Sequence, residues 1–398
     1  MKRCKKRIPI FNHIRMSLPE PTHDALAASN ALLQRIAQEV ERNAGWISWS
    51  RYMEMALYEP ILGYYSGGAT KLGRDGDFTT SPEITPLFGA ALAHAVAPLM
   101  AQTSPRILEF GAGSGKLAFD LLSELAAEGI KVESYAILEL SAELRQRQQR
   151  MLDGFPQVVW LDCLPEAFSG VVIGNEVLDA MPVKLVTKAS PGWHEMGVSV
   201  EERRLVVKSR DCGPALLEQI KTQIPEWDTL PDGYTTEVHP FAAAFMHSLG
   251  SMLAAGEHAA AILIDYGFPA KEYYMAQRGQ GTLMCHYRHH AHTDPFFLPG
   301  LQDISAHVDF SLVARLAIES GLDVLCYTGQ AAFLLAAGIG ELLLRTSPQD
   351  AGRYLPQARA VGMLLSPAEM GELFKVIVVG KNVSLSSPYC RHDQSDRL

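Results

Sequence analysis

A glycine-rich loop between an apolar stretch and an amphipathic stretch constrains the fold of this chain more than any other feature. Residues 111–115 (GAGSG) follow the short, mostly apolar segment 106–110 and precede the helical pattern of 116–128. Further strand-like segments alternate with helical ones at 134–138, 157–161, 170–174, 260–264, 323–327 and 375–379. This alternation predicts an α/β protein with a parallel, doubly wound sheet. Glycines at such a turn let the backbone approach a ligand, and the helix that follows offers free N–H groups.

The spacing of the glycines discriminates between three classes of cofactor. A dinucleotide fingerprint would need Gly or Ala where the chain has Lys116. A P-loop would need Gly at 110 and Ser or Thr at 117, but these residues are Phe110 and Leu117. The remaining pattern, E-x-G-x-G-x-G, suits S-adenosylmethionine, whose ammonium group Glu109 could contact.

Acids follow the next two strands of the expected sheet. Glu139 comes 24 residues after Gly115 (139 − 115), directly after the second strand, where a carboxylate can accept both ribose hydroxyls. Asp162 follows the third strand and could meet the adenine edge. A single acid there is more often a solvated strand end. Three acids after three successive strands, beside the glycine loop, favour a binding site.

The fourth strand ends in a polar group, Asn175 and Glu176, with Asp179 three residues further. The carboxyl ends of strands in a doubly wound sheet line the ligand crevice, so these residues belong at the reacting centre. If the turn is helical, Glu176 and Asp179 share a face. The alternative is a helix cap with two surface acids.

With these motifs, the chain resembles the MidA-type class I methyltransferases, a family whose mitochondrial members are complex I assembly factors that methylate arginine. The resemblance runs from Leu26 to Lys381. It rests on GYY at 63–65, DFTTSPE at 77–83, the glycine loop, GNE at 174–176 with DAMPV at 179–183, DYG at 265–267, and QDI at 302–304 with AHVDF at 306–310.

The resemblance implies a Rossmann-like fold, S-adenosylmethionine as methyl donor and a protein substrate, such as a respiratory complex I subunit. It places Gly111, Gly113, Glu139 and Asp162 at the donor, and Glu176 and Asp179 toward the acceptor. We also assign to the donor site the remaining polar and glycine positions of these motifs, namely Thr80, Ser81, Glu109, Gly115 and Asn175.

Arginine chemistry suits the acidic pair. A guanidinium is always charged in water, and two carboxylates can orient and polarise it through bidentate hydrogen bonds. Glu176 and Asp179 are therefore the expected catalytic residues. Further acceptor-binding candidates are Tyr65, Glu83, Asp265, His286 and His307; Tyr65 could stack on the cation, although a tyrosine pair in a glycine-rich loop is more often simple packing.

Several other classes of site and partner are disfavoured. The histidine-rich segment 285–292 shows no helical pairing of histidines beside an acid, so we expect no metal. Six cysteines without a CxxC pair argue against a zinc ribbon or a disulfide scaffold. A net charge of −9 excludes a globally basic surface, and we expect no nucleic acid and no membrane partner. The oligomeric state is left open.

The expected organisation has a Rossmann-like core with an N-terminal helical lid and two insertions. Its boundaries are an extension at 1–24, a lid at 25–104, the donor-binding core at 105–183, an insertion at 184–258, the rest of the core at 259–382 with a capping insertion at 268–310, and a tail at 383–398. The first 15 residues are basic without an apolar region. We expect a bacterial cytoplasmic enzyme, with the mitochondrial matrix as the alternative. The rival functions are a small-molecule O- or N-methyltransferase and an assembly chaperone without turnover.

Overall fold

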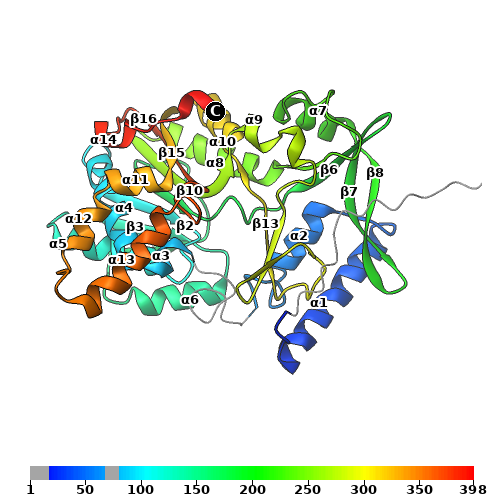
Figure 1. Ribbon diagram of the computed structural model, residues 1–398, viewed down its shortest axis with the longest axis horizontal. Coiled ribbons are helices and arrows are strands. Elements are labelled where there is room, and N and C mark those ends of the chain that lie inside the picture. The colour runs from blue at the N-terminus through cyan, green and yellow to red at the C-terminus, as the bar shows by residue number, and fades with distance from the viewer. Residues whose placement is uncertain (1–17, 68–79) are drawn as a thin grey trace, which may run out of the picture. The chain divides into compact units, whose positions relative to one another are not determined.

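The computed structural model describes residues 18–67 and 80–398 of the chain (Figure 1). The chain divides into two compact units. The first, which we call the antiparallel unit, joins Met1–Ala69, Ala180–Phe241 and Ala270–Ala306. The second, which we call the Rossmann-like unit, joins Thr70–Asp179, Ala242–Pro269 and His307–Leu398. Each unit is therefore assembled from three separate stretches of chain.

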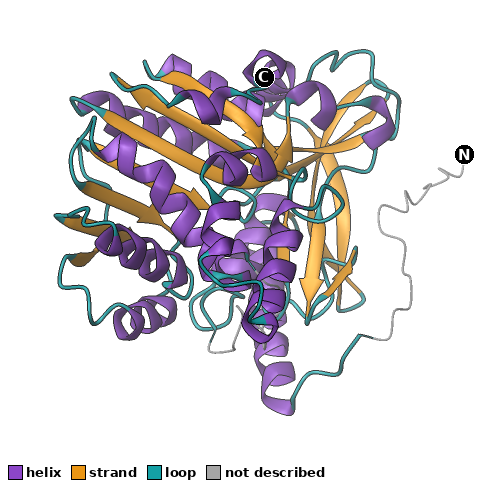
Figure 2. Ribbon diagram, turned by 60° about the vertical axis from the view of Figure 1, so that its left-hand side comes forward, coloured by secondary structure: helices purple, strands orange, loops and turns teal. Residues whose placement is uncertain are grey.

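The Rossmann-like unit is built on one eight-stranded sheet with helices packed against it (Figure 2). The strand order is β15-β16-β10-β5-β2-β3-β4, and β14 pairs with the end of β10. The strands are β2 Arg106–Phe110, β3 Ser134–Leu138, β4 Val158–Leu161, β5 Gly170–Asn175, β10 Ala259–Phe268, β14 Val308–Asp309, β15 Asp323–Gly329 and β16 Phe374–Lys381.

The expectation of a purely parallel sheet is wrong for one strand. Strands β4, β3, β2, β5 and β10 are parallel to one another, as the alternation of strands and helices predicts. Strand β16 instead lies between β10 and β15 and is antiparallel to both. The apolar pattern of a buried strand is the same in either direction, so its sequence carries no signal of orientation.

Helices cover both faces of this sheet. Val171 and Ile173 belong to the core cluster that also holds the apolar residues of α4 and α5. The alternate residues of each strand point to the opposite face of the sheet. On that face, the ring centroids of Phe110 and Phe245 lie 5.0 Å apart. The helices are α3 Ser81–Ile84, α4 Pro86–Met100, α5 Lys116–Ala127, α6 Ala142–Met151, α8 Pro240–Ala255, α10 Phe310–Glu319, α11 Gln330–Ala336, α12 Ile339–Leu344, α13 Ala351–Leu365, α14 Ser387–Cys390 and the 3₁₀ helix η2 Ser395–Arg397.

The sequence predicts one helix over 83–100, but the structure divides it into α3 and α4. Thr85 is extended between them, with φ −159° and ψ 143°. Pro86 follows it, and a residue that precedes proline avoids the helical region. The Thr85 hydroxyl accepts a hydrogen bond from the Leu87 N–H at 3.3 Å and so caps the start of α4.

The antiparallel unit contains two small sheets and the N-terminal helices. Helices α1 and α2 pack against the long strand β7 (Figure 1). The five-stranded sheet has β1 Ile47–Ser48, β6 Lys184–Ala189, β7 Gly192–Glu201, β8 Arg204–Asp211 and β9 Thr235–Val238; the three-stranded sheet has β11 Met284–Tyr287, β12 His290–His292 and β13 Asp303–Ser305. The helices are α1 His23–Arg42, α2 Trp49–Tyr58, α7 Pro214–Gln223, α9 Ala270–Tyr273 and the 3₁₀ helix η1 Ala276–Arg278.

A buried carboxylate holds a loop of the antiparallel unit in place. Glu237 of β9 is fully buried and accepts hydrogen bonds from the Thr282 N–H at 2.7 Å, the Leu283 N–H at 3.1 Å and the Tyr273 hydroxyl at 2.9 Å. A Cβ atom at Gly281 would lie 2.3 Å from Glu237 Oε1, so glycine is required at this close approach. Burial raises the pKa of Glu237.

In the part of the chain that the structure describes, no helix combines the length and the apolar character needed to cross a membrane.

Candidate active site

The glycine loop connects β2 to α5 in a conformation that other residues rarely adopt. Gly111, Gly113 and Gly115 have φ values of +60°, +55° and +88°. Side chains are strained at such angles. A Cβ atom at Gly115 would also lie 3.3 Å from the Cα of Gln148 in α6. The loop is therefore tightly turned, and α6 packs directly on its last glycine.

Glu139 lies directly after β3 and faces this loop through a network of hydrogen bonds. Its Oε1 accepts from the Ser141 N–H at 2.8 Å, and its Oε2 accepts from the Gln148 side-chain amide at 2.9 Å. The same amide donates to the Gly113 carbonyl at 2.9 Å, and the Trp160 indole donates to Gln148 Oε1 at 3.0 Å. Burial raises the pKa of Glu139, and these hydrogen bonds oppose that effect.

Gln148 is a site residue that sequence reasoning missed. It is fully buried and connects Glu139, the glycine loop and β4. One available signal is its position four residues after Leu144, the other buried residue of α6. A long polar side chain on the buried face of an otherwise polar helix needs partners, and here they belong to the site.

Asp162 follows β4, as the sequence suggests, but its side chain is largely exposed. Its Oδ1 accepts a hydrogen bond from the Arg145 guanidinium at 2.6 Å. Leu140, directly after Glu139, is the most exposed of the large apolar side chains that the structure describes, at 82%. An apolar side chain so exposed beside Glu139 was not singled out from the sequence.

Glu109 lies near the end of β2 and is buried beneath the loop. Its Oε2 accepts a hydrogen bond from the Tyr135 hydroxyl at 2.7 Å. Burial raises the pKa of Glu109 to about 8, so a large share of this carboxyl is protonated near neutral pH. The contact with a donor ammonium group remains a prediction.

The polar end of β5 carries a strained residue. Glu176 has a φ of +54°, which is rare outside glycine and asparagine and is concentrated at functional sites. Its Oε1 accepts hydrogen bonds from the Ser81 N–H at 3.2 Å and from the Asn175 amide at 2.9 Å. The other side-chain atom of Asn175, the buried Oδ1, has no hydrogen-bond partner among the described residues. An unpaired buried acceptor beside Glu176 suits a donor group on a ligand.

Asp265 lies in the last half of β10, and its carboxyl oxygens accept hydrogen bonds from backbone N–H groups. Its Oδ2 accepts from the N–H groups of Val177, Leu178 and Asp179 at 2.9–3.3 Å, and its Oδ1 accepts from the Tyr266 N–H at 3.0 Å. Burial raises the pKa of Asp265 well above its usual range, and the charges of Asp179 and Glu176 add to the effect. Its geometry makes it the support of the turn that carries the acidic pair, whereas the sequence suggested contact with the acceptor.

Two residues of α3 connect the glycine loop to the end of β5. The Ser114 hydroxyl of the loop donates a hydrogen bond to Glu83 Oε1. The Ser81 hydroxyl donates to Gln330 Oε1 at 3.3 Å, in addition to the contact of its N–H with Glu176. Thr80 is the N-cap residue of α3 without a side-chain capping bond. Glu83 therefore contacts the loop of the expected donor site. The motif residues 77–79 lie outside the described part of the chain.

The remaining acceptor candidates are divided between the units. His307 belongs to the Rossmann-like unit, where its ring stacks on Phe268 at 5.2 Å and meets Tyr266 edge-on at 5.1 Å. Tyr65 and His286 belong to the antiparallel unit. The Tyr65 hydroxyl donates to Asp303 Oδ1 at 3.0 Å, so the GYY and QDI motifs meet there. Burial lowers the pKa of His286.

Comparisons with known proteins agree with the geometry of the Rossmann-like unit. A family model described as "Putative S-adenosyl-L-methionine-dependent methyltransferase" matches residues 91–328. A solved structure from Burkholderia thailandensis, described as a "likely methyl transferase" bound to S-adenosyl-homocysteine, is 49% identical with a TM-score of 0.89, covering 96% of this chain and 100% of that one.

Curated relatives are more distant. The mitochondrial protein arginine methyltransferase NDUFAF7 of Danio rerio is 28% identical over 88% of this chain and 87% of its own length. The human protein of the same name is 27% identical over 84% of this chain and 80% of its own length.

Fold, glycine loop and relatives lead to the same conclusion, and the resemblance to the family is confirmed. S-adenosylmethionine is the cofactor, and the Rossmann-like fold is that of the methyltransferases that use it. The chain belongs to the MidA-type family of S-adenosylmethionine-dependent methyltransferases.

Proposed function

We propose that this enzyme transfers the methyl group of S-adenosylmethionine to a guanidinium nitrogen of an arginine in a protein. The observation that carries the proposal is the acidic turn after β5, where Glu176 is held in a strained conformation and Asp179 follows three residues later in a turn that is not helical. The names of the curated relatives, which are protein arginine methyltransferases, support the same acceptor.

In this proposal, different residues contact different parts of S-adenosylmethionine. Glu139 has lone pairs beyond the two that Ser141 and Gln148 use, because a carboxylate offers about four acceptor sites. These would accept the ribose hydroxyls, and the exposed Leu140 would cover the adenine. Asp162 would meet the adenine edge. The ammonium end would lie against the glycine loop, near Glu109, Glu83 and the buried Asn175 Oδ1.

The catalytic role falls to Glu176 and Asp179. The bound donor supplies a methyl group on a sulfonium sulfur, which becomes a thioether as the N–CH₃ bond forms and the S–CH₃ bond breaks. The guanidinium lone pair is delocalised, so the nitrogen must be turned and polarised before it attacks. Two carboxylates can do this by charge-assisted hydrogen bonds, and one of them then takes the proton that the methylated nitrogen releases.

Asp265 acts through the turn and not on the acceptor. Three backbone N–H groups of residues 177–179 converge on one of its oxygens, which fixes the direction of both catalytic side chains. Burial and the charges of Asp179 and Glu176 raise the pKa of Asp265, while the backbone N–H groups that donate to it oppose this effect. Within the Rossmann-like unit, His307 remains a proposed acceptor contact, and for Tyr65 and His286 of the antiparallel unit this role stays an expectation from the sequence.

We place the reaction in a bacterial cytoplasm, because the 49% identical structure comes from a Burkholderia species. The eukaryotic relatives are named as mitochondrial proteins. The acceptor is a protein of that compartment, and a respiratory complex subunit is the first class to examine.

The test is transfer of a labelled methyl group. Purified enzyme and donor with a radioactive methyl group are added to lysate of cells that lack this chain, and labelled products are identified by mass spectrometry. Label on protein arginine, absent with Glu176→Gln and present with Glu218→Gln, supports the proposal; Glu218 is an exposed acid on α7. Label only on lysine or on small molecules would overturn the arginine assignment. Donor binding without transfer in any lysate would favour an assembly chaperone.

A further inference from the structure

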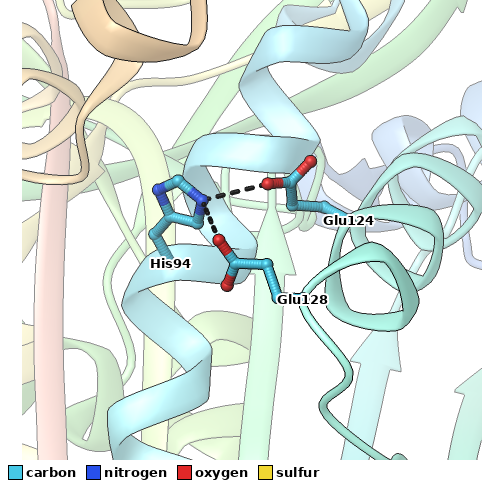
Figure 3. A group of neighbouring side chains, drawn as sticks. All are labelled: His94, Glu124 and Glu128. Carbon is cyan, nitrogen blue, oxygen red and sulfur yellow. Dashed lines mark hydrogen bonds and ion pairs between the residues drawn. The ribbon is translucent and has the colours of Figure 1, made fainter.

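Three side chains far from the glycine loop bring metal-ligating atoms together (Figure 3). His94 lies on α4, and Glu124 and Glu128 lie at the end of α5. His94 Nε2 is 3.1 Å from Glu124 Oε1 and 3.1 Å from Glu128 Oε1. All three candidate ligand atoms lie within 4.8 Å of one another.

The hydrogen bond of the other ring nitrogen of His94 indicates which nitrogen carries the proton. His94 Nδ1 lies 2.9 Å from the Ala337 carbonyl oxygen. A carbonyl only accepts hydrogen bonds, so Nδ1 carries the proton, and in a neutral imidazole Nε2 is then a lone pair. The lone pair then faces two carboxylate oxygens, and a positive charge between these three acceptors, either a bound metal ion or the proton of an imidazolium, would satisfy them.

Glu124 and Glu128 bring two negative charges close together at the end of α5. Glu124 and Glu128 are four residues apart on one helix, where like charges repel, and they lie at the C-terminal end, where the helix dipole disfavours anions. Arg345 compensates only in part. Its guanidinium donates to Glu124 Oε2 at 2.8 Å and lies 4.0 Å from Glu128 Oε1, so Glu124 Oε1 is left to face His94.

We propose that His94 Nε2, Glu124 Oε1 and Glu128 Oε1 bind a divalent transition-metal cation of the zinc class. Tetrahedral zinc has nitrogen and oxygen ligands at about 2.0–2.2 Å, which places neighbouring ligand atoms about 3.3–3.5 Å apart, close to the two contacts of His94. Water takes the fourth position. The Ala337 carbonyl is the outer partner that a ligating histidine normally has. Calcium and magnesium prefer all-oxygen sets of six or more ligands.

The site lies apart from the expected centre of methyl transfer. Gly115 of the glycine loop caps the first turn of α5, and Glu124 comes nine residues later (124 − 115), about 13 Å along the helix axis. The cation connects α4, α5 and the turn between α11 and α12, which together cover one face of the sheet. The proposal is therefore independent of the acceptor and of the catalytic acids.

Metal binding to the full chain tests the proposal. The protein is stripped with a chelator and dialysed against zinc chloride at pH 7.5, and bound metal is measured by mass spectrometry. Cobalt(II) is substituted in parallel, because its absorption intensity distinguishes four-coordinate from six-coordinate sites. We expect one zinc per chain and a four-coordinate cobalt spectrum. Replacing a ligand should cost more than the 10–100-fold loss of affinity that is typical for an outer partner, so His94→Gln and Glu128→Gln should bind at least about a hundredfold more weakly.

Two controls separate metal binding from folding. His247→Gln changes an exposed histidine of α8 and should keep the zinc. Thermal melting, with and without zinc, should show stabilisation of the wild type and none of His94→Gln. If the wild type binds no more zinc than His94→Gln, the cation between the carboxylates is the proton of an imidazolium and the proposal is wrong. S-adenosylmethionine binding by metal-free protein should be unchanged, which distinguishes this outcome from failure of the methyltransferase assignment.

Discussion

The two units of this protein build their buried polar groups in different ways. In the Rossmann-like unit, the glycine loop, the acid near the end of β2 and the acids after β3 and β4 come from one continuous stretch, residues 106–162. In the antiparallel unit, Glu237, Tyr273 and Thr282 form a network from segments separated by 36 and 45 residues. The first unit can be read from local motifs, because parallel strands bring their carboxyl ends to one edge. The second requires the fold.

This difference leads to an expectation about mutations. Changes at the carboxyl edge of the large sheet should alter ligand binding or methyl transfer and leave folding largely intact. Changes in the network of the antiparallel unit should alter stability and leave donor affinity intact. Each prediction below tests one side of this contrast.

The largest effect is expected from Gly113→Val. Gly113 has a φ of +55°, which a β-branched residue rarely adopts, and its carbonyl is held by Gln148. Calorimetric titration with S-adenosylmethionine should show no measurable binding. The control is Gly129→Val, which has a φ of +72° but nothing within 4 Å of its Cβ position. Similar melting temperatures with loss of binding only at Gly113 support the assignment, and unchanged affinity in Gly113→Val contradicts it.

Glu176→Gln should leave donor affinity nearly intact and slow methyl transfer about a hundredfold or more, the scale of losing one charge-stabilising group. The carboxylate matters most when the guanidinium is being polarised, so the loss appears in turnover. Asp179→Asn should act in the same direction but more mildly. Single-turnover transfer and donor affinity are measured for both variants. A wild-type rate in Glu176→Gln would make the acidic pair structural.

Glu237→Ala tests the antiparallel unit. It leaves the buried N–H groups of Thr282 and Leu283 without an acceptor, and each such group costs about 1–3 kcal/mol. Urea unfolding should show this loss of stability, while the affinity for S-adenosylmethionine measured under folding conditions should stay within twofold of the wild type, roughly 0.4 kcal/mol. A large loss of donor affinity without loss of stability would break the contrast between the units.

Glu139→Ala should weaken donor binding at least about tenfold, because it removes a charged acceptor of hydroxyl hydrogen bonds worth about 1.5–3 kcal/mol each. Asp162→Asn is the comparison, since Asp162 is exposed and paired with Arg145, and a smaller loss is expected. Equilibrium titration of both variants gives the ranking. If Asp162→Asn loses more affinity than Glu139→Ala, the assignment of the ribose to Glu139 is incorrect.

The smallest effects concern pH, and they have opposite signs in the two units. Burial raises the pKa of Glu109 to about 8 from an ordinary value near 4.5, so the folded state holds the extra proton and stability falls as pH rises from 4.5 to 8. Burial lowers the pKa of His239 to about 4 from 6.5, so the unfolded state holds the extra proton and stability falls as pH decreases from 6.5 to 4.

Urea unfolding at a series of pH values measures the free energy of unfolding both between pH 4 and 6.5 and between pH 4.5 and 8. Each group contributes a slope of at most about 1.4 kcal/mol per pH unit. Glu109→Gln should flatten the decline toward pH 8 and leave the acid limb unchanged, and His239→Gln should do the reverse. Parallel profiles for wild type and variant would show that the group does not titrate in this window.

Much of the fold could be predicted from the sequence, because the evidence for it is local. The strand at 106–110, its glycine loop and the helix from 116 lie in the structure where the periodicity predicts them. The direction of β16 and the break at Thr85 were less accessible from the sequence. Orientation depends on which neighbour a strand meets, and the apolar run over 83–100 conceals the break that the residue before Pro86 introduces.

For the site, the sequence by itself determined which residues stand at the strand ends: the glycines, Glu139, Asn175, Glu176 and Asp179. Spacing along the chain is enough for that, since a strand, a turn and a helix are short-range structures. Only the tertiary structure decided the contacts of Gln148, Asp265 and His94. Gln148 contacts a loop 35 residues away, Asp265 supports a turn about 87 residues away, and His94 meets Glu124 across 30 residues. Burial and partner set the charge and direction of such side chains, and both depend on how distant segments pack.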